Sequence, residues 1–177
     1  MALSIVLLVC AGLFLRNLQA ATTIDKGFDS GHLLIANLDP SLQGYDQART
    51  VEFYRRLTQR LAALPAVRHV STATLMPLGL SNNDWSVTIP GYTPSPNEMM
   101  SVENNVVGTD YFASMGIPII KGRGIEARDD STAQKVLVIN QHFADHFWPG
   151  QDPLGRVVHL GGADHVVIGV EPTGKYE

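Results

Sequence analysis

Two histidines have the spacing best suited to chemistry in this sequence. His142 and His146 are four residues apart, so a helix would place both imidazole rings on one face, as it does for zinc ligands. The zinc-peptidase motif requires a glutamate directly after the first histidine, and Phe143 stands there instead. Asp145 lies between the two histidines but points to a different side of the helix. We therefore interpret the pair as part of a solvated helix face and predict no metal site.

Adjacent carboxylates and glycine-rich stretches are the other candidates for catalysis or nucleotide binding. Asp129 and Asp130 are neighbours, whereas a catalytic carboxyl pair needs a defined separation across its substrate, so we interpret them as a surface turn. The stretches KGRG and LGGAD lack the lysine and hydroxyl residue that close a P-loop. The serines lack the glycine setting of a nucleophile elbow. We predict no catalytic residue and no cofactor, and an enzyme would need a site that no motif reveals.

Two aromatic pairs are more informative than these candidates. Tyr111 and Phe112 precede a glycine- and proline-containing stretch, and Phe147 and Trp148 directly precede Pro149. Large aromatic side chains anchor loops when they pack against strands. When exposed, the same rings concentrate binding energy. We expect loop anchoring at these four positions, with docking of a partner protein as the functional alternative.

Composition limits the classes of protein that fit this chain. Its 177 residues are 45% hydrophobic, enough for one domain or two small ones with a packed core. The formal charge of -4 and the scattered basic residues argue against a nucleic-acid partner. Cys10 is the only cysteine, which excludes an intrachain disulfide and a cysteine-rich metal site.

The first half of the chain predicts a strand, helix, strand unit. Residues 32–38 form a short apolar run closed by a proline, and residues 67–75 are rich in β-branched residues; both indicate strands. Between them we predict a helix over residues 47–64, capped by Asp46 and ended by Pro65. One apolar stripe of this helix is expected to face a core, and it consists of Phe53, Leu57, Leu61 and Leu64.

The second half predicts short strands and short helices. Residues 77–97 read as an irregular region that contains a brief strand at 85–89. Gly161 and Gly162 join two strands in a hairpin. The further strands are predicted at residues 100–107, 135–140, 157–160 and 165–170. The helices are predicted at residues 141–147 and from Thr109 or Asp110 through Met115, where Gly116 ends the helix.

The N-terminal segment is apolar and uncharged until Arg16. Fifteen such residues are too few to cross a bilayer, which needs about 20. A cleaved signal ending before Ala21 is one alternative, but no positive charge precedes the run. A lipoprotein signal at Cys10 would need a small residue where Val9 stands, and a buried core helix would need protein on every side. We favour the C-terminal part of a transmembrane helix over residues 1–20, followed by a connector at 21–31 and a globular domain at 32–177.

The strongest family resemblance lies in two segments, VVGTDYFASMGIPIIKGRGIEARDD and VLVINQHFADHFWPGQDPLGRVVHL. Together with DKGFDSGHLLIANLDP and FYRRLTQRLAALPAVRHVSTATLMPL, in this order and spacing, they resemble the MacB-type periplasmic core domain of bacterial ABC-transporter permeases, especially orphan permeases that carry two such units. One departure is Gly124-Ile125, where the family usually has an acidic and an aromatic residue.

The resemblance implies an α+β fold with a porter-like strand-helix-strand lobe and an inserted, mostly β lobe over roughly residues 80–162, preceded by a truncated transmembrane helix. It implies an extracytoplasmic domain of an efflux permease in the bacterial inner membrane, which transmits conformational change or docks partners without catalysis. The implied partners are a cytoplasmic ATPase subunit or domain, periplasmic adaptor proteins and, through residues 1–20, the lipid bilayer. A secreted or periplasmic binding protein or hydrolase with a cleaved signal is the alternative.

Overall fold

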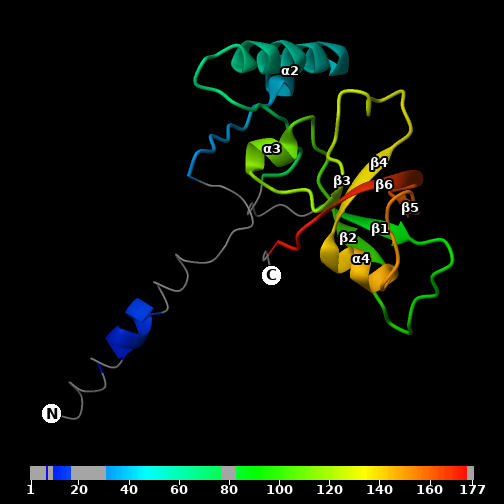
Figure 1. The fold of residues 1–177 in the computed structure, drawn as a ribbon. Coiled ribbons are helices and arrows are strands. Elements are labelled where there is room, and N and C mark those ends of the chain that lie inside the picture. The colour runs from blue at the N-terminus through cyan, green and yellow to red at the C-terminus, as the bar shows by residue number, and fades with distance from the viewer. Residues whose placement is uncertain (1–6, 8–9, 17–30, 77–82, 175–177) are drawn as a thin grey trace.

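The fold is α+β, as predicted, and is built around one mixed sheet (Figure 1). The computed structural model describes residues 7, 10–16, 31–76 and 83–174. The strands follow the order β2-β1-β5-β6-β3, in which β5 and β3 pair with one edge of β6. Strand β4 pairs with the other edge of β6. Their bounds are β1 Asp84–Thr88, β2 Ser101–Glu103, β3 Lys121–Gly122, β4 Val136–Asn140, β5 Val157–Leu160 and β6 Ala163–Glu171. The helices are the 3-10 helix η1 Pro40–Gln43 and the α-helices α2 Gln47–Ala62, α3 Tyr111–Met115 and α4 Gln141–Phe147.

The β5–β6 hairpin is the centre of the sheet and matches the prediction closely. Leu160 pairs with Ala163 across a two-residue turn in which Gly161 and Gly162 have φ angles of 57° and 83°. Positive φ at both turn positions suits the right-handed twist of a hairpin, and glycine adopts it without steric cost. Val158 is completely buried in this hairpin. The hairpin therefore joins the strands on either side into one core.

Helix α4 begins directly where β4 ends. The side chain of Asn140, the last residue of β4, accepts a hydrogen bond from the backbone N–H of Phe143 at 2.8 Å and so caps the helix. Because β4 runs parallel to β6, the helix begins at the end of the sheet where β6 also ends. Ala144 is buried in the core together with Ile139 and Val170. The predicted strand and helix over residues 135–147 are confirmed.

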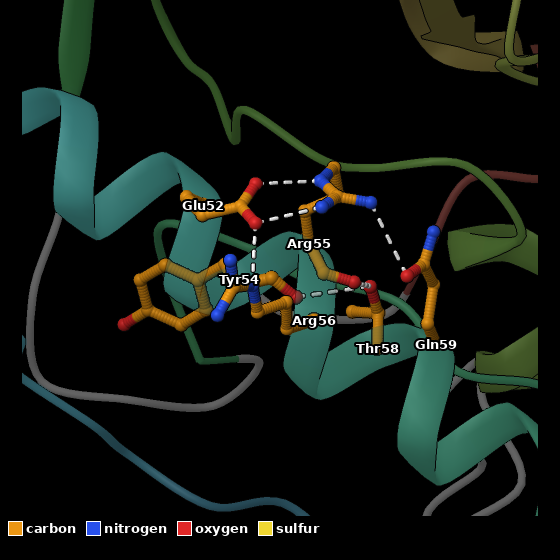
Figure 2. A network of polar contacts seen from close by, with 6 residues as sticks. All are labelled: Glu52, Tyr54, Arg55, Arg56, Thr58 and Gln59. Carbon is orange, nitrogen blue, oxygen red and sulfur yellow. Dashed lines mark hydrogen bonds and ion pairs between the residues drawn. The ribbon is translucent and has the colours of Figure 1, made fainter.

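Helix α2 lies apart from the sheet in Figure 1. Asp46 caps it through a 2.8 Å hydrogen bond from the backbone N–H of Arg49, as predicted, and the helix ends at Ala62, ahead of Pro65. Figure 2 shows polar contacts along its surface, where the Glu52 carboxylate accepts hydrogen bonds from Arg55 and Arg56. These contacts lower the pKa of Glu52 to about 2, so it remains charged at neutral pH.

The strands predicted on either side of α2 are wrong. Residues 32–38 form no strand, and residues 67–75 make only an isolated bridge between Ala73 and Val107. A strand requires a neighbour for its backbone N–H and C=O groups, and no described strand lies beside either segment. Leu34 is accordingly 93% exposed. The predicted strand-helix-strand unit is therefore represented in the described residues by its helix alone.

The apolar stripe of α2 also lacks the core that we expected it to face. The helix contains no buried residue, and Leu61 and Leu64 are 37% and 50% exposed. Phe53 and Leu57 are half-buried. Side-chain periodicity predicts a helix with an apolar face, but only a packing partner can bury that face. Within the described part of the chain this face is covered only in part, where the Tyr45 ring lies 6.0 Å from that of Phe53.

Strand β2 is shorter than predicted, and an asparagine beyond its end binds the backbone of Leu75. The prediction of a strand over residues 100–107 is too long, because the ladder stops at Glu103. Beyond it, the Asn105 side-chain amide accepts from the Leu75 N–H at 2.9 Å and donates to the Leu75 carbonyl at 3.1 Å. One side chain therefore satisfies the backbone groups that a paired strand would satisfy. Strand β3, which has only two residues, was not predicted.

The membrane segment predicted at residues 1–20 lies largely outside the described residues, as does the connector at 21–31. Residues 10–16 are helical. Among the helices that the structure describes, none has the length and apolar character needed to cross a membrane.

Candidate docking surface and its aromatic anchors

Trp148 anchors the end of α4 in the core. Its side chain is only 6% exposed, and its ring packs against those of Phe143 and Phe147 at centroid distances of 6.0 and 6.4 Å. Its backbone N–H donates to the carbonyl of Ala144 at 2.9 Å, which completes the last turn of the helix. A ring buried to this degree stabilises the fold and offers little surface to a partner.

Phe147 is half-buried at the margin of the same cluster. Its ring contacts Phe143 at 4.6 Å and meets Tyr92 edge-on at 4.9 Å, and His146 also contacts it edge-on at 4.6 Å. Tyr92 belongs to the segment between β1 and β2, so Phe147 joins α4 to a part of the chain that precedes it by more than 50 residues. Part of this ring remains available to a partner.

Tyr111 and Phe112 form a second aromatic anchor on α3. Asp110 precedes the helix in the left-handed conformation, and Gly116 ends it, as predicted, in the same conformation. The two rings meet edge-on at 5.5 Å, and both side chains are half-buried. Phe112 lies so close to Gly124 that a β-carbon there would come within 3.3 Å of the ring. Phe112 thus fixes the glycine-containing stretch that follows β3.

The two aromatic pairs do not form one surface in the described part of the chain. Ring contacts are made within the α3 pair and within the α4 cluster, and none joins the two. The four residues predicted as loop anchors or docking residues therefore divide into two separate positions. Trp148 is an anchor, whereas Tyr111, Phe112 and Phe147 retain exposed ring surface.

A polar cluster that the sequence analysis missed lies beside Phe147. The carboxylate of Glu98 accepts a hydrogen bond from the Tyr92 hydroxyl at 2.8 Å and one from the Ser95 backbone N–H at 2.7 Å, and it lies 2.9 Å from His146 Nε2. The Ser95 N–H, with smaller contributions from Tyr92 and His146, lowers the pKa of Glu98. Because His146 is 48 residues from Glu98, no local sequence pattern indicates this contact.

The two histidines lie on one face of α4, as their spacing predicts. The rings of His142 and His146 stack at 6.4 Å with planes inclined by 26°. His146 is engaged by Glu98, and the backbone N–H of His142 donates to the Thr173 hydroxyl. In the described ranges, no three histidine, cysteine or acidic side chains are placed so that they could hold a metal ion together.

The side chain of Asp129 is buried, which the interpretation of the acidic pair as a surface turn did not predict. Its side chain is only 6% exposed and accepts two hydrogen bonds from the guanidinium of Arg123, at 2.6 and 2.8 Å. The adjacent Asp130 is exposed and accepts from the backbone N–H groups of Thr132 and Ala133, which is typical of a turn. Arg123, assisted by the Glu126 N–H, lowers the pKa of Asp129 to about 2. Both residues lie at turns, since the Asp129 backbone N–H donates to the Glu126 carbonyl at 2.9 Å. What differs from the prediction is the Asp129 side chain, which is buried against Arg123 instead of lying at the surface.

We expect Asp129→Asn to destabilise the fold near neutral pH. The loss should be about 1–3 kcal/mol in the free energy of unfolding, the range for a hydrogen-bonded charged group that is partly screened by solvent. A carboxyl whose pKa is lower in the folded than in the unfolded chain stabilises above its unfolded pKa and loses that effect as the pH falls toward its folded pKa. Denaturant unfolding should thus show the difference from wild type shrinking from about pH 4 toward about pH 2. Asp130→Asn is the matched control and should cost less; an equal cost would contradict the assignment.

An open groove runs along α2 and has no counterpart in the predicted site residues. It combines the rings of Tyr45 and Phe53 with the side chain of Leu57 and is bordered by arginines. The remaining lining residues are Arg49, Glu52, Arg56 and Arg60. The apolar periodicity of α2 was visible in the sequence, but its exposure was not.

Comparison with known proteins supports the resemblance noted in the sequence. The family described as MacB-like periplasmic core domain matches residues 1–176. The macrolide export ATP-binding/permease protein MacB of Hahella chejuensis is 31% identical over 75 residues, which are 42% of this chain and 12% of that protein. The chain thus aligns with only a small part of that relative.

Two solved structures are similar to this one. The periplasmic region of MacB from Actinobacillus actinomycetemcomitans has a TM-score of 0.50 and 19% identity, covering 66% of this chain and 49% of that structure. The extracellular domain of the noncanonic ABC-type transporter YknZ from Gram-positive bacteria has a TM-score of 0.47 and 19% identity, covering 66% and 56%. At this identity, the MacB likeness supports the fold alone. Because the family match extends over almost every residue, the chain belongs to the MacB-like periplasmic core domain family.

Proposed function

We propose that this chain is the extracytoplasmic domain of an ABC-type export permease, which transmits conformational change or docks periplasmic partners and catalyses no reaction of its own. The match of residues 1–176 to the periplasmic core domain family carries the proposal. The Hahella relative is named as an ATP-binding and permease protein. We accordingly expect a cytoplasmic ATPase subunit or domain to supply the energy, and residues 1–20 to contact the lipid bilayer.

The arrangement of the sheet suits the transmission of motion. Strand β6 pairs with three strands. The parallel strand β4 pairs with five residues of β6 along one edge, and β3 and β5 pair with it along the other edge. We expect a sheet whose strands are hydrogen-bonded in this way to move as one unit, because the close-packed side chains beside it resist deformation. Force applied at α4 would therefore reach the whole sheet through β4.

The partly exposed aromatic rings are the docking candidates. Binding energy at interfaces concentrates in aromatic side chains that can be desolvated by the partner. Tyr111, Phe112 and Phe147 meet this condition, whereas Trp148 is already buried within its own domain. Periplasmic adaptor proteins are the partners that we propose for these rings, which offer two separate positions for docking.

Cysteine labelling in cells tests the location of the domain. In a full-length permease in which Cys10 and every cysteine outside residues 1–177 are replaced by serine, one new cysteine would replace the exposed Ser131. We expect a membrane-impermeant maleimide to label this cysteine in intact spheroplasts, and the cysteine-free parent to remain unlabelled. Labelling only after lysis would place the domain in the cytoplasm and overturn the proposal.

Mass spectrometry of the purified protein tests the alternative of a secreted or periplasmic binding protein or hydrolase. An anchored domain retains the residues before Ala21 and sediments with membranes. A soluble product that begins at Ala21 would show that the apolar segment is a cleaved signal. That result would favour the alternative even if the cysteine were labelled from outside.

A further inference from the structure

One carboxylate joins the segment between β1 and β2 to helix α4. Glu98 Oε2 accepts from the Ser95 N–H, and Oε1 accepts from the Tyr92 hydroxyl, so both contacts fold the segment onto itself. The same Oε1 lies 2.9 Å from Nε2 of His146, and this ring nitrogen is 3.4 Å from the Tyr92 hydroxyl. His146 is therefore the residue of α4 through which these polar contacts hold the segment.

The same contact positions an aromatic ring over Phe147. The Tyr92 ring meets Phe147 edge-on at 4.9 Å and lies 6.0 Å from the His146 ring. Tyr92 and the neighbouring Met100 pack against the hydrophobic core. Movement of the segment away from α4 would uncover one side of Phe147, a half-buried aromatic ring of this helix.

The charged groups around His146 are few. Glu98 and Tyr92 face it from the β1–β2 segment, and His142 stacks against it from the preceding turn of its own helix. Asp145 is bound by the Gln141 side chain at 2.6 Å, one helical turn away. Glu98 is thus the one carboxylate with a described contact to the imidazole, and its lowered pKa keeps it charged when the histidine changes protonation.

We propose that Tyr92, Glu98 and His146 form a pH-sensitive clip, which fastens residues 90–98 to α4 in mildly acidic solution and loosens this segment in mildly alkaline solution. A histidine side chain ordinarily gains its charge between about pH 8 and pH 5. The imidazolium adds a coulombic attraction to the Glu98 carboxylate, which the neutral imidazole lacks, and this attraction strengthens the hydrogen bond between the two side chains. The clip can be tested whether or not the proposed transport function holds, because Tyr92, Glu98 and His146 all belong to this domain and require no partner.

Hydrogen exchange of the 177-residue chain tests the clip. After correction for the intrinsic exchange rate, we expect the protection of peptides covering residues 90–98 to fall by about 3- to 10-fold between about pH 5.5 and about pH 8. Peptides covering β5 and β6 should change by less than about twofold, because they open only with the core. Equal protection of residues 90–98 at both pH values would overturn the proposal.

Three variants assign the effect to individual side chains. His146→Gln keeps an N–H donor but no longer titrates, so the protection of residues 90–98 should become independent of pH. Glu98→Gln should lower that protection at the acidic pH toward the alkaline value, which provides a second test should His146→Gln alter the helix. His159→Gln is the control, because His159 pairs with Asp164 on the β5–β6 hairpin; it should preserve the pH dependence. An unchanged pH dependence in His146→Gln would reject the clip.

Discussion

Replacing Trp148 with alanine is expected to lower the free energy of unfolding by about 3–5 kcal/mol. The ring is 6% exposed and belongs to the same buried cluster as Val158 and Val170, so its removal would leave a cavity that the rigid sheet can only partly fill. Urea unfolding followed by far-UV circular dichroism measures the loss without relying on tryptophan fluorescence. A loss under about 1 kcal/mol would contradict the assignment of Trp148 as an anchor.

Two further substitutions separate anchoring from docking. Trp148→Phe keeps most of the buried apolar surface and should cost clearly less than the alanine variant. Phe147→Ala removes a ring that is half-exposed and should also cost less than Trp148→Ala. A docking role predicts the opposite order for partner binding, with Phe147→Ala weakening a complex while leaving the fold intact.

Replacing Gly122 with alanine is expected to detach β3 from β6. A β-carbon at this position would lie 2.2 Å from the carbonyl oxygen of Ile168 and 2.8 Å from a methyl group of Leu154, far inside van der Waals contact. The residue also has a φ of 74°, which L residues rarely adopt. We expect a loss of about 3 kcal/mol or more in the free energy of unfolding, or faster exchange of the Arg123 N–H that donates to Ile168.

Gly155→Ala is the matched control for this substitution. Gly155 has a φ of 77°, and a β-carbon there would meet no atom within 4 Å. Its cost should therefore be limited to the backbone strain of a left-handed residue, about 1–2 kcal/mol. If both variants lost the same stability, backbone strain alone would explain the effect and the clash with Ile168 would be irrelevant.

Elements with strong local signals were predicted well. Asp46 and Gly116 mark the ends of helices through side-chain and backbone capping, and both act as predicted. The Gly161-Gly162 turn specifies a hairpin because both residues can adopt positive φ. These features depend on residues within a few positions of one another, so the sequence alone contains the information.

Elements that depend on distant partners were predicted poorly. Residues 32–38 and 67–75 have the composition of strands, but composition does not supply the neighbouring strand that would complete their hydrogen bonds. In the second segment, the amide of Asn105 takes over part of this pairing from 30 residues away. The two-residue strand β3 was missed because its pairing with β6 gives no periodic signal.

The candidate site shows the same division. The aromatic residue types at positions 111, 112, 147 and 148 were recognisable from the sequence, and so was the family. Their burial was not, since only packing distinguishes the 6% exposed Trp148 from its half-exposed neighbour Phe147. The contacts of Arg123 with Asp129 and of Glu98 with His146 were likewise invisible as motifs.

The sequence by itself determined the capping at Asp46 and Gly116 and the hairpin turn, because capping and turn chemistry are properties of neighbouring residues. Segment order determined the family, and the resemblance to that family implied the α+β class. Only the tertiary structure decided which apolar faces are buried, which charges are paired and which ring remains exposed. Those properties depend on whether a partner atom from a distant segment occupies the space beside a side chain. Helix α2 is the example: its apolar stripe was predicted to face a core, but among the described residues no distant segment buries it, and the stripe remains partly exposed.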